Sequence, residues 1–349
     1  MKMDHKNYEC SAMNSAKSLL MLLVVLYHSM LCCTGLSWGP QSAYQTSRIL
    51  YYIAQFLNSI HIYAFTFVSG YVYAYLRYET DRYSDWKTLI RKKTHRLLLP
   101  YVATAILWVV PFSCYFWRTG PKELVVNYLL GCAPSQLWFL LMLFWQFVFF
   151  QPLADRITVQ RKKICLFLTA FLLLHYLPTV LSVVHVPNVF QFLTALRYAL
   201  FFYLGIVFRR TDTRKFITWK VLGWGTIATI LLFAGQQILL SQGALSKAIA
   251  MGINPFVSIF GTYSFIIACL LLNRKSYEGK GSIIQKSGMT VYLFHQQIIY
   301  LSICLFNKPW MPPAALTLLN FVVGLSGGIA IYLILRKWKI TRFLFAIVE

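Results

Sequence analysis

The sequence predicts an all-α polytopic membrane protein with about ten transmembrane helices and both termini in the cytoplasm. Hydrophobic residues make up 58% of the 349 residues and charged residues only 12%, about half the charge of a typical soluble chain. The mean hydropathy is +0.59. The formal net charge is +23, because 33 Lys and Arg outnumber 10 Asp and Glu. An excess of basic residues is typical of the cytoplasmic loops of membrane proteins.

Ten apolar stretches are long enough to cross a bilayer. A hydrocarbon core of about 30 Å needs about 20 helical residues at a rise of about 1.5 Å per residue. No alternating pattern of the kind found in membrane β-barrels is present, so the stretches are predicted to be helices. Residues 1–349 are expected to form a single membrane domain. The predicted spans are 18–38, 49–75, 97–117, 137–154, 164–184, 190–208, 221–240, 256–272, 289–306 and 314–335.

The basic residues orient this map. With the N-terminus inside, 27 of the 33 fall on the cytoplasmic side, 5 fall outside, and Arg197 lies within a span. Because cytoplasmic loops collect Lys and Arg, this asymmetry favours ten spans with both ends of the chain inside. The positive charge therefore orients the protein in a lipid bilayer, and nucleic acid is not an expected partner.

The acidic residues and cysteines exclude several kinds of site. All ten Asp and Glu lie outside the predicted spans. A pump built on buried carboxylates is therefore disfavoured, and so is paired-carboxylate catalysis within the membrane. The eight cysteines are scattered and show no Cys-x-x-Cys or Cys/His spacing typical of a metal site. No metal is expected.

His28 is the first polar group of interest, near the middle of the first predicted span. An imidazole at that depth costs free energy unless it has a partner. Lys17 precedes it by 11 residues, which in an α-helix is three turns plus about 20° and a rise of about 16 Å. One helix face thus carries a cation at its entrance and an imidazole halfway across. This suits an anionic ligand and proton chemistry, although a packing histidine and a lysine at a span end also fit.

Five groups of residues together suggest a family. They are Asn14-Ser15-Ala16-Lys17 with Leu22-Leu23-Val24-Val25-Leu26-Tyr27-His28; His61-Ile62-Tyr63-Ala64-Phe65 with Val68-Ser69-Gly70-Tyr71; Arg91 to Tyr101; Leu137-Trp138-Phe139-Leu140; and Tyr292-Leu293-Phe294-His295. In this order they resemble the acyltransferase-3 family of integral membrane O-acyltransferases. The lysine at position 17 is similar to the fucose 4-O-acetylase-like branch. Tyr63 replaces a common proline, and Lys93 stands at a position that is often arginine.

The resemblance implies transfer of an acyl group, usually acetyl, from cytosolic acetyl-CoA to a hydroxyl of a surface glycan or lipid-linked saccharide. It also implies the inner membrane of a bacterium. Acyl-CoA and the saccharide are then substrates, and no permanently bound cofactor is expected. His28 matches the histidine regarded as catalytic. An imidazole near neutrality can remove the hydroxyl proton or accept the acyl group itself, and the sequence leaves both routes open.

The basic stretch before the third span is the expected donor site. Coenzyme A carries several phosphate charges, and Arg and Lys both bind phosphate oxygens. By family position the cofactor-binding residues would be Lys17, Arg91, Lys92, Lys93 and Arg96. The alternative is a cluster that only orients the chain.

Four further residues are candidates for substrate binding. His61 and His295 stand in family motifs, Arg197 is the one basic residue within the predicted spans, and Trp138 can stack on a sugar or adenine ring. Each also has a structural alternative, since membrane histidines are often hydrogen-bonded within the protein and Trp is common at span ends. Ser69-Gly70 is expected to permit a bend or a close helix approach.

A transporter or flippase for a saccharide or acidic metabolite is the alternative function. Paired Gly/Pro-broken spans in an inverted repeat would favour transport, and the sequence shows none. The acceptor sugar, the acylated position and the oligomeric state stay open.

Overall fold

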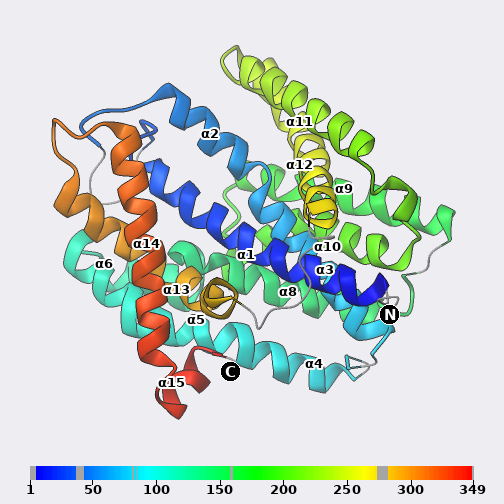
Figure 1. The fold of residues 1–349 in the computed structure, drawn as a ribbon, viewed down its shortest axis with the longest axis horizontal. Coiled ribbons are helices and arrows are strands. Elements are labelled where there is room, and N and C mark those ends of the chain that lie inside the picture. Colours follow the sequence, from blue (N-terminus) through cyan, green and yellow to red (C-terminus); the bar gives the residue numbers. More distant parts are fainter. Residues whose placement is uncertain are drawn as a thin grey trace. The chain divides into compact units, whose positions relative to one another are not determined.

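A computed structural model describes residues 5–36, 43–80, 82–83, 85–157, 160–272 and 282–347. Every regular element within these ranges is a helix, which confirms the all-α prediction (Figure 1). The α-helices are α1 His5–Leu31, α2 Arg48–Asn58, α3 His61–Tyr78, α4 Trp86–Lys93, α5 Leu99–Thr104, α6 Val110–Trp117, α7 Pro121–Leu124, α8 Trp138–Leu153, α9 Arg161–Val183, α10 Phe192–Arg210, α11 Trp219–Leu240, α12 Ala244–Leu272, α13 Ile283–Phe306, α14 Pro313–Leu335 and α15 Lys339–Leu344.

Nine helical segments within these ranges are long and apolar enough to cross a membrane. They correspond to nine of the ten predicted spans. The remaining prediction, 49–75, is divided in the structure, because α2 ends at Asn58 and α3 begins at His61. α3 has 18 residues but is not among the nine, because its tyrosines, His61 and Arg77 lower the mean hydropathy over 18 residues.

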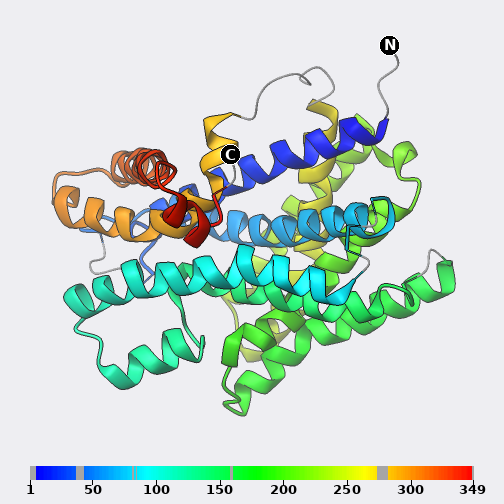
Figure 2. The ribbon, with the colours of Figure 1, turned by 90° about the horizontal axis from the view of Figure 1, so that it is seen from below.

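The predicted third span belongs to one long helical run, 86–117, seen as the cyan to teal helix in Figure 2. Two π-helical turns interrupt it, η1 Thr94–Leu98 and η2 Ala105–Val109. Each wide turn comes just before a proline, Pro100 or Pro111. A proline lacks an N–H and its ring clashes with the carbonyl four residues earlier, so a wider turn accommodates it.

The chain forms two compact units, and α1, α2 and α10 each contribute residues to both. Unit 1 comprises the described residues of Met1–Leu20, Gln55–Thr80 and Phe201–Lys280. In it α11 packs on α12, and α12 packs on α3. α3 also crosses α10 without intervening side chains, since a Cβ added to Gly70 would lie 2.0 Å from the carbonyl oxygen of Phe202. The expectation that Gly70 permits close approach is confirmed.

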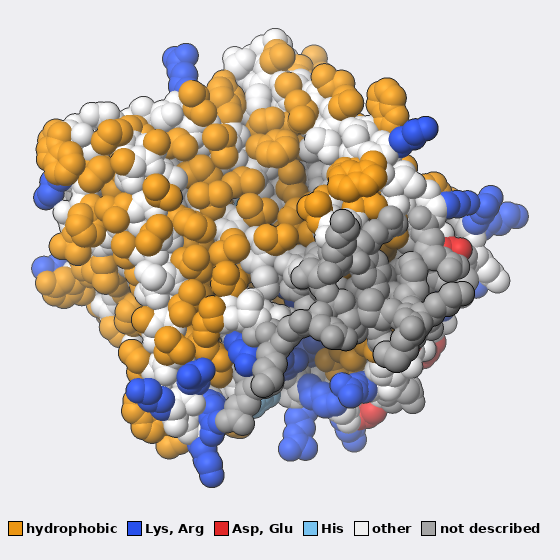
Figure 3. All heavy atoms as spheres, viewed as in Figure 1, with side chains coloured by type: hydrophobic (Ala, Val, Ile, Leu, Met, Phe, Trp, Pro, Cys, Tyr) orange, Lys and Arg blue, Asp and Glu red, His pale blue; other side chains and the backbone are white. Residues whose placement is uncertain are grey.

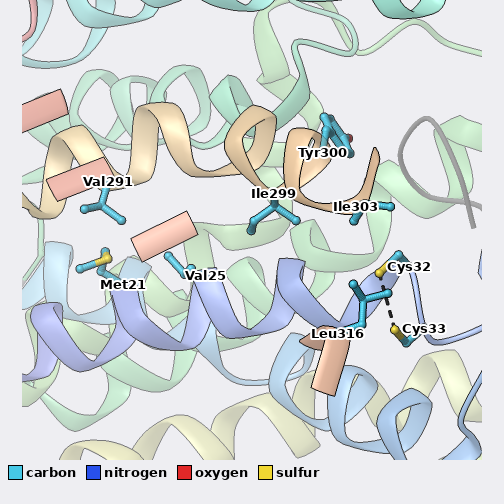
Figure 4. Close-up of a cluster of buried hydrophobic side chains, with 9 residues drawn as sticks. All are labelled: Met21, Val25, Cys32, Cys33, Val291, Ile299, Tyr300, Ile303 and Leu316. Atoms are coloured by element: carbon cyan, nitrogen blue, oxygen red, sulfur yellow. Dashed lines mark hydrogen bonds between the residues drawn. The ribbon is translucent and has the colours of Figure 1, made fainter. Parts of the chain in front are cut away.

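Unit 2 comprises the described residues of Met21–Ala54, Asp81–Leu200 and Gly281–Glu349. Its α13 and α14 pack side by side. Figure 4 shows the apolar cluster that joins this pair to the second half of α1, with Val25 near Ile299 and Leu316 near Cys32. Asn320 of α14 adds a polar contact, since its amide donates to the Ser29 carbonyl at 3.3 Å. These contacts set one face of α1 against α13.

The surface is that of a membrane protein. Hydrophobic side chains are spread widely over the face seen in Figure 3. Several spans are apolar yet scarcely buried within the protein: only 11% of the α11 window and 17% of the α9 window is buried. A helix that is apolar all round and not covered by protein is expected to face lipid.

Candidate functional site

Two histidines meet in unit 2. His28 of α1 and His295 of α13 have ring centroids 4.9 Å apart at an interplanar angle of 69°. The Nε2 of His295 lies 3.3 Å from the Nδ1 of His28. His295 is fully buried, whereas His28 is only half-buried. Two motifs separated by 267 residues in the sequence thus form one site, with His28 as the more accessible partner.

Backbone carbonyls indicate which nitrogen of each ring carries the proton. The Nδ1 of His28 lies 2.8 Å from the carbonyl oxygen of Val24. The Nδ1 of His295 lies 3.0 Å and 2.9 Å from two carbonyl oxygens of its own helix. A carbonyl can only accept, so in each neutral ring Nδ1 carries the hydrogen and Nε2 the lone pair. The His295 Nε2 then accepts from His28, and the basic nitrogen of His28 is its Nε2.

A buried amide network positions this part of α13. The Gln136 side chain, just before α8, donates to the Leu293 carbonyl and to Gln297 Oε1, both at 2.7 Å. The Gln136 backbone N–H donates to Gln296 Oε1 at 3.0 Å, and the Tyr292 hydroxyl donates to the Gln136 carbonyl. Because these bonds surround His295 in sequence, they hold the rotation of α13 that directs His295 toward His28.

A basic cleft of 1160 Å³ lies elsewhere in unit 2, along α4, η1 and the C-terminal segment. Its lining includes Arg91, Lys92 and Arg96, three of the four adjacent bases predicted for the donor site. His95 and Arg342 also line it, and no Asp or Glu stands among the described residues of the lining. Four cations without a carboxylate in one cleft suit a ligand with several negative charges.

The fourth predicted base, Lys93, is not a lining residue of this cleft. Its Nζ lies 3.5 Å from the ring centroid of Phe147 and 5.0 Å from that of Tyr83. Tyr83 lines the cleft, and its backbone carbonyl accepts from Gln151 at 2.9 Å. Burial raises the pKa of the Tyr83 hydroxyl, although the charges of Arg96 and Arg82 counteract this. The hydroxyl therefore stays protonated at neutral pH and able to donate to an anion.

The start of α4 is fixed by a side-chain cap. Asp85 accepts from the backbone N–H of Thr88 at 2.7 Å, as expected of an N-cap. Hydrogen bonds from the Thr88 side chain and from its backbone N–H lower the pKa of the Asp85 carboxyl. The cap defines where the helix that carries Arg91 and Lys92 begins.

Two predicted site residues belong to unit 1. Lys17 lies on α1, half-buried, on the same continuous helix as His28. His61 is the first residue of α3, is almost fully buried, and its Nδ1 is hydrogen-bonded to the Leu57 carbonyl. Their roles in binding donor and acceptor stay predictions.

The remaining two predicted residues lie in unit 2. Arg197 of α10 donates to the Thr179 hydroxyl at 3.0 Å, and its own carbonyl accepts from the His175 Nδ1 at 2.7 Å. The neutral hydroxyl of Thr179 is thus one hydrogen-bond partner of the Arg197 guanidinium. Trp138 is the first residue of α8 and packs on Tyr198, with ring centroids 5.8 Å apart.

Sequence reasoning missed the amide network and Arg342. Gln296 and Gln297 directly follow His295 in an apolar span, and buried amides in a membrane require partners, so they carried a signal. No motif marked Arg342 as a site residue, because in the sequence it is only one of several basic residues after the last predicted span.

A family model described as an acyltransferase domain, that of acyltransferase-3, matches residues 11–337. The match covers nearly the whole chain and contains both histidines and three of the four cations of the cleft. The chain belongs to the acyltransferase-3 family. Membership implies membrane O-acyltransferase activity, in agreement with the resemblance of the motifs. No curated protein and no solved structure gave a match to this acyltransferase-3 chain.

Proposed function

We propose that the protein is an O-acetyltransferase that moves acetyl from cytosolic acetyl-CoA to a hydroxyl of a surface glycan or lipid-linked saccharide at a bacterial inner membrane. The observation that carries the proposal is the His28–His295 pair in a chain of the acyltransferase-3 family. In both rings Nδ1 donates its hydrogen to a backbone carbonyl. Lys17 at the basic position supports a place in the fucose 4-O-acetylase-like branch.

In this proposal the Nε2 of His28 is the general base. It removes the proton of the acceptor hydroxyl as the oxygen attacks the thioester carbonyl carbon. The carbon–sulfur bond then breaks, the saccharide ester forms, and the proton held by His28 passes to the sulfur, which leaves as the thiol of coenzyme A. His295 accepts from the Nδ1–H and keeps the ring in the tautomer that leaves Nε2 basic.

An acyl-histidine route uses the same nitrogen. Nε2 attacks the thioester carbonyl carbon, the carbon–sulfur bond breaks, and coenzyme A leaves as its thiolate. The acceptor hydroxyl then attacks the acetyl carbon, the bond from Nε2 to the acetyl group breaks, and the hydroxyl proton passes by way of the freed Nε2 to the thiolate. Both routes require the lone pair on Nε2.

The basic cleft is the proposed place for the phosphates of the donor. Arg91, Lys92 and Arg96 line it together, and guanidinium groups bind phosphate oxygens in pairs. Lys93 contacts Phe147 and Tyr83, so we assign it a structural role: it packs on Tyr83, which lines the cleft. For the acceptor we keep His61, Arg197 and Trp138 as candidates, since aromatic rings and polar groups together suit a saccharide.

The test is acetyl transfer from labelled acetyl-CoA to a saccharide acceptor in membranes that contain the protein. His28→Ala is expected to lower the rate by about 10²–10⁴-fold, the usual contribution of a general base. His185→Asn is the matched control, since His185 lies in a turn with a positive φ of 58° that Asn tolerates. It is expected to keep the wild-type rate.

Two results would speak against the proposal. Full activity of folded His28→Ala would exclude the assigned mechanism. Saccharide flux across the membrane without dependence on acyl-CoA would favour the alternative transporter.

A further inference from the structure

The C-terminal segment, Lys339 to Ile347, forms one wall of the basic cleft. Arg342, Phe343, Ala346 and Ile347 line the cleft from this segment. The facing lining comes from α4, η1 and the start of α5. Two stretches about 250 residues apart in the chain therefore share one positively charged hollow.

Aromatic contacts hold the segment in place. Phe343 packs against His95, with ring centroids 4.6 Å apart. Phe345 is buried and packs against Phe294 at 5.5 Å. Phe294 is the residue before His295, so the segment contacts the stretch of α13 that carries His295.

Backbone hydrogen bonds complete the fold of the segment. α15 is followed by a tight turn in which the Ile347 N–H donates to the Arg342 carbonyl at 2.9 Å and the Phe345 N–H donates to the Thr341 carbonyl at 3.0 Å. Ala346 takes a positive φ of 50° in this turn. The position of Arg342 is thus set by folded structure on both sides of it.

The charges of the lining indicate the ligand. Arg342 brings the number of lining Lys and Arg side chains to four, and the described lining contains no carboxylate. A cluster of cations in one cleft attracts a ligand with several negative charges. A guanidinium is suited to bidentate binding of phosphate oxygens.

We propose that Arg342 is a phosphate-binding residue of the acyl-donor site, and that the C-terminal segment forms one wall of this site. The proposal rests on the proposed function, because it assigns the polyanion to coenzyme A. It adds to the donor site a residue outside the basic stretch before the third span.

The experiment is calorimetric titration of purified full-length protein with coenzyme A. Arg342→Gln is expected to weaken affinity about 10-fold or more, the usual loss for a hydrogen bond between charged groups. Lys339→Gln removes a cation from the same helix at an exposed position outside the cleft. This control is expected to stay within about 2-fold of wild type.

Unchanged affinity in Arg342→Gln would overturn the proposal, as would an equal loss in Lys339→Gln, which would mark a general charge effect. If Arg342→Gln does not fold, Arg342→Lys is titrated instead. It keeps the charge but loses the fork, so several-fold weaker binding supports the proposal and wild-type affinity overturns it. A wild-type protein that neither binds coenzyme A nor transfers acetyl from it would instead contradict the proposed function itself.

Discussion

The histidine pair shows how two single side chains divide one task. His28 is half-buried and its Nδ1–H is directed to the Val24 carbonyl and toward His295. His295 is fully buried and has no solvent-exposed atoms. The partly accessible ring is therefore suited to substrate, and the buried ring to orienting it.

His295 is accordingly expected to act as a positioning residue. His295→Phe removes one of the two acceptors of the His28 Nδ1–H and leaves the Val24 carbonyl. We expect kcat to fall by about 10²-fold while KM for acetyl-CoA stays unchanged. His295→Gln keeps an acceptor oxygen and is expected to recover part of kcat. Steady-state kinetics of both variants check this; equal kcat in the two variants would contradict a role through the hydrogen bond.

At this scale the sequence predicted the residues better than their partners. His28 and His295 were both candidates, but their contact depends on which faces of α1 and α13 pack together, and that depends on side chains such as Val25 and Ile299. The bases of the cleft were predicted from adjacency, whereas Arg342 joins them only through the packing of Phe343 on His95.

Among the elements, the crossing of α3 and α10 is the least tolerant of change. The Cβ positions of Gly70 and Gly205 would each lie 2.0 Å from a backbone oxygen of the other helix. A backbone oxygen cannot rotate away as a flexible side chain can, so any added atom separates the helices.

Gly70→Ala is therefore expected to lower the free energy of unfolding by about 1–3 kcal/mol or more, as overpacking does. Gly235→Ala is the control, because nothing lies within 4 Å of the added atom and Ala is favoured over Gly in a helix by about 1 kcal/mol. Thermal unfolding in detergent compares the two. A Gly70→Ala protein as stable as Gly235→Ala would show that the helices separate at no cost.

The elements were predictable where apolar runs are long and unbroken. Nine predicted spans have counterparts among the described helices. The division of 49–75 was missed because no Pro, Gly or charged residue marks the break at Ser59 and Ile60. The π-helical turns were missed as well. A proline within a helix indicates that the helix is distorted, but not whether the distortion is a kink, a break or a π-helical turn.

For the whole molecule, the number of crossings decides where the ends lie. The prediction of ten spans counts α3 as a crossing beside the nine long segments of the described residues. An even number of crossings would place both termini on one side. The excess of bases predicts that this side is the cytoplasm.

A fluorescent protein fused to the C-terminus is therefore expected to fluoresce, and an alkaline phosphatase fused there is expected to be inactive, because the phosphatase needs the oxidising exterior. Fusions after Phe306, the last residue of α13, are expected to give the opposite result. An active C-terminal phosphatase would mean an odd number of crossings, with α3 not spanning.

The π-helical turn η1 has a consequence for related chains. A π-helical turn encloses one residue more than an α-helical turn, so η1 amounts to a single extra residue between α4 and α5. Loss of one residue there would convert the π-helical turn to ordinary α-helix, and the side chains of α4 and α5 would keep their present directions around the helix axis. Related chains can therefore differ by one residue in the spacing of their bases before this span, and a motif written with fixed spacing would overlook them.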